Sequence, residues 1–135
     1  MKNSLPWRIG LAIYIGGLAT IGYWPTPVDQ PFHGALRAVL SYLHYRGVPG
    51  WFDYHLVEAS ANVVLFIPFG ILIVMALPRM TWPQLAGIGV LASVCLELGQ
   101  LAFITTRFST LLDIATNTAG AVIGIATARL LPKRK

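Results

Sequence analysis

Charged side chains are scarce in this sequence. Lys, Arg, Asp and Glu make up 11% of the 135 residues and hydrophobic residues 56%, whereas charged residues make up about 25% of a typical soluble domain. So few charges cannot cover a water-exposed surface, but they suit a surface that faces lipid. The composition therefore excludes a soluble globular domain, and the length fits a single domain over residues 1–135.

Several patterns on which common chemistry depends are also missing. The chain has one cysteine, Cys95, so it cannot form an internal disulfide bond. It contains no Cys/His zinc spacing, no phosphate-binding glycine loop and no GxSxG nucleophile pattern. The basic residues form no stripe with interleaved aromatic residues. We therefore expect no cofactor, no metal site and no nucleic-acid partner.

Long apolar runs dominate what is present. Four runs are close to the about 20 residues that a helix needs to cross a bilayer, and they cover about 7–23, 59–77, 82–105 and 111–131. They predict an all-α fold, an integral membrane four-helix bundle. The first run also has some features of a cleaved signal peptide, with Lys2 before it and small residues at Gly17 and Ala19. Its apolar character continues past that point, which favours a span.

The basic residues are distributed unevenly between the two predicted sides of the membrane. Four spans leave both termini on one side, together with the turn at 78–81. That side carries seven of the ten basic residues and no acid, whereas all five acids fall on the opposite side or at the outer helix ends. The positive-inside rule then places both termini in the cytoplasm. The seven basic residues are Lys2, Arg8, Arg79, Arg129, Lys133, Arg134 and Lys135.

The segment 24–57 forms a long external connection between the first two spans. Its apolar residues recur at helical spacing, and they are Phe32, Leu36, Val39, Leu40 and Leu43. This pattern predicts an extra amphipathic helix lying at the outer membrane interface. The helix either packs on the bundle as a simple cover or shapes an entrance for lipid or substrate.

Polar side chains occur within three of the spans at spacings that place each pair on one helix face. These pairs lie in the same outer layer of the predicted bundle, and a short loop nearby carries Arg107, which could balance their charge. Charged residues inside a membrane usually face the bundle interior or water. The pairs are Glu58 with Asn62, Glu97 with Gln100, and Asp113 with Asn117.

Two further features concern how the helices pack. Gly120 and Gly124 form a small-xxx-small face in line with Asn117, which lets a neighbouring helix approach closely. Pro68 lies inside the second span and cannot donate a backbone hydrogen bond, so we expect it to kink that helix.

The polar side chains allow two interpretations. They could form a hydrogen-bonded clasp that holds four helices together, or they could form a ligand or catalytic site. The local charges are three carboxylates, from Glu58, Glu97 and Asp113, and one cation, Arg107. A clasp does not need so many more acidic than basic side chains. That excess favours a site.

These segments resemble the VanZ-like family. The resemblance rests on Glu58-xxx-Asn62-xxx-Phe66-Ile67-Pro68-Phe69-Gly70, on Glu97-xx-Gln100, on Arg107, and on Asp113-Ile114-xx-Asn117-Thr118-x-Gly120, read in order along residues 58–124. It implies a small four-span protein of the bacterial cytoplasmic (inner) membrane. The family's namesake is associated with resistance to the glycopeptide teicoplanin.

Three functions remain open at this point. The first is a non-enzymatic envelope factor that binds a lipid or lipid-linked cell-wall component and so alters glycopeptide sensitivity. The second is a small membrane enzyme that acts on a lipid-linked phosphate or sugar, with carboxylates as acid–base groups or metal ligands. The third is a proton-coupled transporter or flippase. The expected partners are membrane lipids and, with them, a lipid-linked cell-wall precursor or a glycopeptide.

Overall fold

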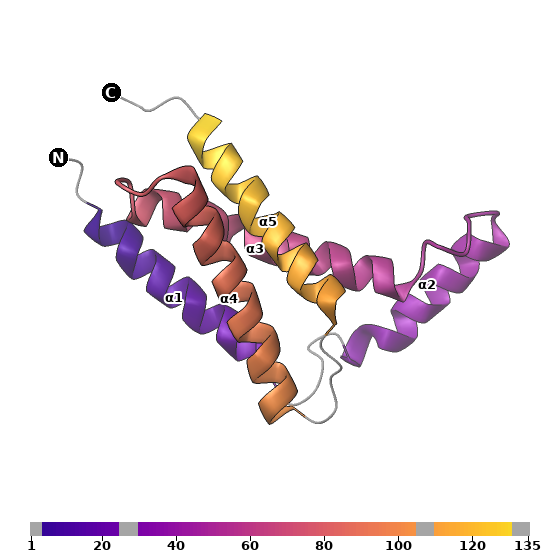
Figure 1. The fold of residues 1–135 in the computed structure, drawn as a ribbon. Helices are drawn as coiled ribbons and strands as arrows, with labels where there is room; N and C mark the ends of the chain where they lie inside the picture. Colours follow the sequence, from indigo (N-terminus) through magenta and orange to yellow (C-terminus); the bar gives the residue numbers. More distant parts are fainter. Residues whose placement is uncertain (1–3, 25–29, 105–109, 131–135) are drawn as a thin grey trace.

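The chain folds into five α-helices and one short 3-10 helix (Figure 1). This computed structural model describes residues 4–24, 30–104 and 110–130. The described residues contain no strand, so the all-α fold is confirmed. The helices are α1 (Leu5–Gly22), η1 (Gln30–Phe32), α2 (His33–Tyr45), α3 (Tyr54–Ala76), α4 (Trp82–Phe103) and α5 (Leu111–Leu130).

Four of these helices, α1, α3, α4 and α5, are long and apolar enough to cross a membrane, as the hydropathy predicts. The largest difference is at the start of α3, which begins at Tyr54 instead of residue 59. Asp53 caps this helix by accepting a hydrogen bond from the Leu56 amide at 3.0 Å. The helix therefore starts at its capping residue, ahead of the apolar run. The predicted span ends at 105 and 131 lie outside the described residues.

The helix α3 is central to the bundle. It packs most extensively against α5 and also against α1, while α4 packs mainly against α5. Their shared core contains fully or almost fully buried apolar side chains. These are Phe66, Phe69, Ile73, Leu85, Ala121 and Ile125.

Glycines allow the backbones of α3 and α5 to meet directly. A Cβ atom added at Gly120 would fall on the Val63 carbonyl oxygen, and one added at Gly124 would fall on the Ile67 carbonyl oxygen. The Cβ of the latter would also lie 3.0 Å from the Gly70 Cα atom. The small residues thus occupy the helix contact that the small-xxx-small spacing predicts.

Pro68 lies inside α3, whose helical residues run through it from Tyr54 to Ala76. Proline is tolerated in the interior of membrane-spanning helices because neighbouring helices and local adjustments satisfy the freed backbone groups. The kink expected at Pro68 stays a prediction.

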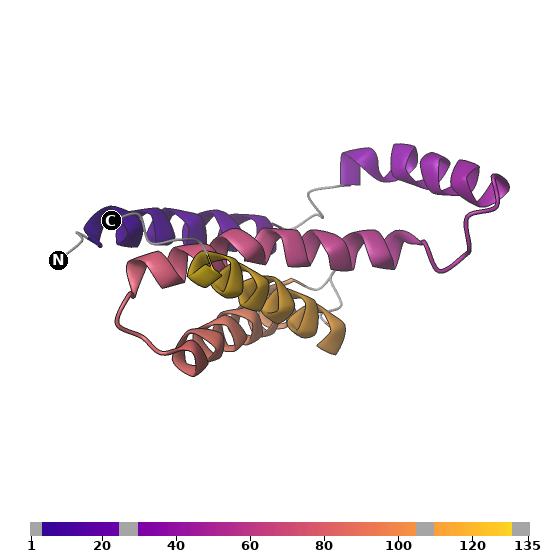
Figure 2. The same ribbon diagram turned by 90° about the horizontal axis from the view of Figure 1, so that it is seen from above.

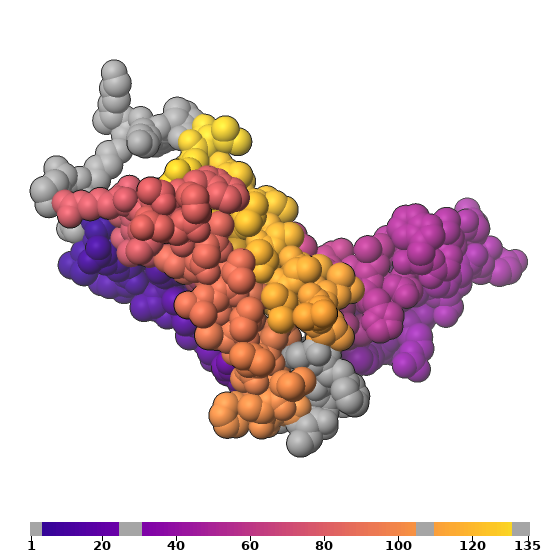
Figure 3. Space-filling view, in the orientation of Figure 1, coloured from indigo at the N-terminus to yellow at the C-terminus, as the bar shows by residue number. Residues whose placement is uncertain are grey.

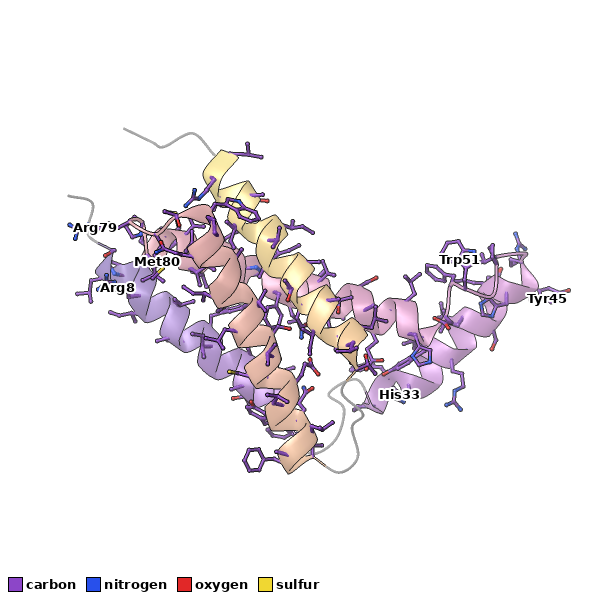
Figure 4. The ribbon with its side chains drawn as sticks, viewed as in Figure 1. Arg8, His33, Tyr45, Trp51, Arg79 and Met80 are labelled. Carbon is purple, nitrogen blue, oxygen red and sulfur yellow. The ribbon has the colours of Figure 1, made fainter. Side chains whose placement is uncertain are left out.

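The start of α1, the α3–α4 turn and the end of α5 lie at the same end of the bundle (Figures 1 and 4). Two arginines bind backbone carbonyls there. The Arg8 Nε atom donates to the Ala76 oxygen at 3.2 Å, and the Arg129 Nη2 atom donates to the Met80 oxygen at 2.8 Å. Arg79 lies in the same turn. We call this the basic end; Lys2 and residues 133–135 lie outside the described residues.

The predicted extra helix is α2, which projects to one side of the bundle (Figures 2 and 3). It lies alongside the first part of α3. Leu40 is buried and Leu36 and Leu43 are partly buried, but Phe32 and Val39 are exposed. Val39 of α2 and Phe32 of η1 therefore add exposed apolar surface to this segment. Such a surface fits contact with lipid, and its place at the membrane interface stays a prediction.

Candidate functional site: a cavity with carboxylate and amide groups

A cavity of about 510 Å³ lies inside one end of the bundle. Its wall is formed by the end of α1, by η1 and α2, by the first half of α3, by the end of α4 and by the start of α5. It is at the opposite end of the bundle from Arg8 and Arg129. The structure brings six of the predicted polar residues to its wall: Glu58, Asn62, Glu97, Gln100, Asp113 and Asn117. Arg107, the predicted cation, lies outside the described residues.

The deepest polar pair joins α4 to α5. The Asn117 Nδ2 atom donates to the Glu97 Oε1 atom at 2.9 Å. Glu97 is 5% exposed and Asn117 is 2% exposed. Glu97 lies six residues before the end of α4 and Asn117 six residues after the start of α5, which places both about 9 Å from those helix ends at a 1.5 Å rise per residue. Two antiparallel helices therefore present these groups at the same level.

A second pair joins α3 to α5. The Asn62 Nδ2 atom donates to the Asp113 Oδ1 atom at 3.1 Å. The other carboxylate oxygen of Asp113 accepts bonds from the Thr110 amide at 2.8 Å and from its hydroxyl at 2.7 Å. Thr110 in turn accepts from the Asp113 amide at 3.3 Å, which completes a capping box at the start of α5. Asp113 thus has a structural task as well as a place in the cavity.

Gln100 connects the cavity wall to α1. Its Nε2 atom donates to the carbonyl oxygen of Gly22, the last residue of α1, at 3.0 Å. A Cβ atom at Gly22 would lie 2.6 Å from the Leu96 Cδ1 atom, so the glycine allows the end of α1 to approach α4. The bond satisfies a carbonyl that the helix end would leave without an intrahelical partner.

Glu58 differs from the other two cavity carboxylates because its side chain is exposed. It lies on α3 one turn before Asn62, at the open side of the cavity. The lining residues of α1, η1 and α2 are apolar, among them Leu18, Ile21, Phe32 and Leu36, whereas α3 and α4 contribute apolar side chains as well as polar ones. The cavity therefore combines acidic and amide groups from α3, α4 and α5 with hydrocarbon from most of its walls.

Sequence reasoning missed several polar residues that support this site. Ser93 is fully buried, and its hydroxyl donates to the Ile114 carbonyl at 3.1 Å. It lies four residues before Glu97, so the helical spacing could have placed it on the same face. The Tyr14 hydroxyl donates to the Leu65 carbonyl at 2.7 Å, and no pattern in the sequence indicates that contact.

The charged side chains in the described lining of the cavity are all hydrogen-bond acceptors. Its described lining contains three carboxylates and no Lys or Arg. Within residues 4–24, 30–104 and 110–130, no three His, Cys, Asp or Glu side chains group closely enough to hold a metal ion. The described carboxylates thus do not meet around one point, as a metal ion bound by three of them would require.

Comparison with known proteins identifies one family. A sequence model of the family described as VanZ/LLP1 matches residues 12–132, which is nearly the whole chain. No curated protein and no solved structure matches the chain significantly.

Proposed function

The chain belongs to the VanZ/LLP1 family and is a VanZ-like membrane protein, and we propose that its cavity binds the headgroup of a membrane lipid or of a lipid-linked cell-wall component in the outer leaflet. The carrying observation is that carboxylates and amides from three helices line one cavity whose other walls are apolar. A lipid has the same division between a polar headgroup and hydrocarbon chains.

The charge of the described lining favours one kind of headgroup over others. Carboxylate oxygens accept hydrogen bonds, and charge-assisted bonds to them are stronger than neutral ones. Glu58, Glu97 and Asp113 therefore favour a group rich in donors, such as an ammonium group or the hydroxyl groups of a sugar. A bare phosphate would be repelled by these three carboxylates.

The volume limits how much of the ligand can enter. A cavity of about 510 Å³ is within the range of small-molecule sites, roughly 300–1,000 Å³. It suits one headgroup and the start of its chains, and it is too small for a whole glycopeptide antibiotic. An effect on teicoplanin sensitivity would therefore arise through the lipid-linked component and not by enclosure of the drug.

The basic end supports the orientation that we propose for the chain. Arg8, Arg79 and Arg129 lie there, and the cavity lies at the other end of the same bundle. By the positive-inside rule, the basic end and both termini face the cytoplasm. The cavity then opens to the outer leaflet of the bacterial cytoplasmic (inner) membrane, where cell-wall intermediates are used.

The test is to substitute the cavity carboxylates one at a time, as Glu58→Gln, Glu97→Gln and Asp113→Asn. Asp53→Asn is the matched control, because Asp53 caps α3 and does not line the cavity. Each protein is expressed in a host that lacks its own homologue. Folded yield, the lipids retained after purification, and the teicoplanin sensitivity of the host are then compared.

We expect at least one cavity variant to keep normal folded yield but lose retained lipid and any teicoplanin phenotype, while Asp53→Asn keeps both. If every cavity variant folds normally and retains the same lipid as the unchanged protein, the proposal is wrong. Conversion of the retained lipid to a product would indicate an enzyme, and proton-linked flux in vesicles would indicate a transporter. Either result would replace the binding function.

A further inference from the structure

A second, smaller cavity lies between α2 and the start of α3, next to the first. Its volume is about 280 Å³, and it is lined by His33, Arg37, Leu40 and Tyr54. Tyr54 lines both cavities, and α2 contributes Leu36 to the larger one and Arg37 to the smaller one. The two cavities therefore adjoin across α2 and Tyr54. Among the residues that the structure describes, the lining of the smaller one contains no carboxylate.

His33 and Tyr54 are joined across this cavity. The His33 Nε2 atom lies 3.0 Å from the Tyr54 hydroxyl oxygen, and their rings meet edge to face with centroids 5.0 Å apart. The donor in this pair depends on the imidazole tautomer: when Nε2 carries the proton, the imidazole donates to the tyrosine oxygen. His33 is also the first residue of α2, where the helix dipole gives a partial positive charge (Figure 4).

Arg37 brings a full positive charge to the same place. It lies four residues after His33, so both side chains are on one face of α2. Arg8 and Arg129 are engaged with backbone carbonyls at the basic end, and Arg46 stacks on the Tyr42 ring at 5.9 Å. Arg37, by contrast, has no hydrogen bond or ion pair with any part of the chain that the structure describes.

We propose that His33, Arg37 and Tyr54 form an anion subsite that binds the phosphate ester of the ligand whose donor-rich group occupies the carboxylate cavity. Guanidinium and hydroxyl donors around a pocket at a helix start suit phosphate oxygens. This inference rests on the proposed function and narrows it. The ligand class becomes a phosphate ester that also carries an ammonium or sugar group, with its hydrocarbon along the apolar wall.

The experiment uses the full-length protein in polyoxyethylene-ether micelles, which contain neither phosphate nor sugar. Three probes are titrated: dioctanoylphosphatidate, dioctanoylglycerol, which has the same chains without phosphate, and inorganic phosphate as a competitor. The variants are Arg37→Gln and Tyr54→Phe. Arg46→Gln is the matched control, since it removes the same charge just beyond the other end of α2 and does not line the pocket.

We expect the unchanged protein to prefer the phosphatidate over the diacylglycerol. Arg37→Gln should weaken phosphatidate binding about tenfold or more, Tyr54→Phe should weaken it less, and Arg46→Gln should leave it unchanged. Competition by millimolar inorganic phosphate indicates that the phosphate group alone is sufficient for binding, and its absence shows that the lipid part is required. Equal binding of the two lipids, or equal losses in Arg37→Gln and Arg46→Gln, would overturn the anion subsite.

A fourth probe separates this inference from the proposed function. Decyl glucosaminide carries a sugar and an amine but no phosphate, so only the carboxylate cavity should recognise it. If Glu97→Gln weakens its binding while Arg37→Gln leaves phosphatidate binding unchanged, the cavity proposal stands and the anion subsite is wrong. If Glu97→Gln has no effect while Arg37→Gln weakens phosphatidate binding, the anion subsite stands alone.

Discussion

The direct contact between α3 and α5 can be tested by Gly120→Ala. In an open helical position, replacing glycine by alanine stabilises a helix by about 1 kcal/mol. At Gly120 the new methyl group would fall on the Val63 carbonyl oxygen and lie 2.9 Å from the Phe66 Cβ atom. Neither atom is the end of a flexible side chain, so neither can rotate away. The helix backbones themselves must move apart.

The size of the expected loss of stability follows from this separation of the two helices. To reach ordinary van der Waals contact, the two backbones must separate by roughly an ångström, and overpacking of this kind costs about 1–3 kcal/mol. This exceeds the helix-propensity gain, so we expect Gly120→Ala to lower the free energy of unfolding by about 2 kcal/mol or less. The hydrogen bond between Asn62 and Asp113 joins the same two helices, so the separation should weaken it as well.

The assay is reversible unfolding of the purified protein in mixed micelles, followed by circular dichroism. Gly17→Ala is the matched control, because Gly17 lies inside α1 and a Cβ atom there would meet nothing within 4 Å. It should be neutral or stabilising by up to about 1 kcal/mol. If Gly120→Ala and Gly17→Ala have the same effect, the two helices do not pack as described and the reasoning fails.

Three other changes test hydrogen bonds of the bundle in the same unfolding assay. Asn117→Ala removes the donor to Glu97, and because hydrogen bonds to charged groups are worth about 1.5–3 kcal/mol, a loss well below that range would count against the pair. Gln100→Leu removes the donor to the Gly22 carbonyl, so amide hydrogen exchange at the end of α1 should speed up and stability should fall by about 1 kcal/mol; unchanged exchange would refute this contact. Tyr14→Phe deletes a hydroxyl that binds a carbonyl of α3, and it should cost about 1 kcal/mol without affecting lipid retention.

The number and order of the long helices could be predicted from hydropathy, because each apolar run has the length of a bilayer span. The predicted starts at 82 and 111 agree with the structure, whereas the start of α3 could not be found in this way. The beginning of α3 depends on the Asp53 cap, and the following residues Tyr54 and His55 are too polar to extend an apolar run. Helix termini are determined by capping, whereas hydropathy reports only what faces lipid or core.

The gathering of polar residues at one level could also be anticipated, since the pairs fall at helical spacing near the same ends of their helices. The spacing could not predict which of these side chains form hydrogen bonds with one another. The amide of Asn117 bonds to Glu97, the amide of Asn62 bonds to Asp113, and Gln100 binds the end of α1. These pairings depend on the rotation and separation of whole helices, which the spacing of residues within one helix does not determine.

The second cavity could not be foreseen for a related reason. In the sequence, His33 and Tyr54 are separated by a helix and a turn, and the spacing of Leu36, Leu40 and Leu43 only indicates that α2 has one face to bury. The structure places that face against α3, with His33 and Arg37 beside it. Which polar residues meet is thus a consequence of how the amphipathic helix docks.

The carboxylates do not all have the same role. Some hold helices together, as a clasp would, whereas another is accessible in the cavity, as the proposed site requires. Both oxygens of Asp113 accept bonds from Asn62 and Thr110, so this carboxylate holds α3 to α5 and caps a helix. Glu58 is exposed at the open side of the same cavity. Glu97 is buried, and its Oε1 atom accepts a hydrogen bond from Asn117. Such an arrangement, in which hydrogen bonds between helices fix the cavity wall and Glu58 is reached from solvent, fits the proposed binding site, because side chains held by their neighbours keep a cavity in one shape.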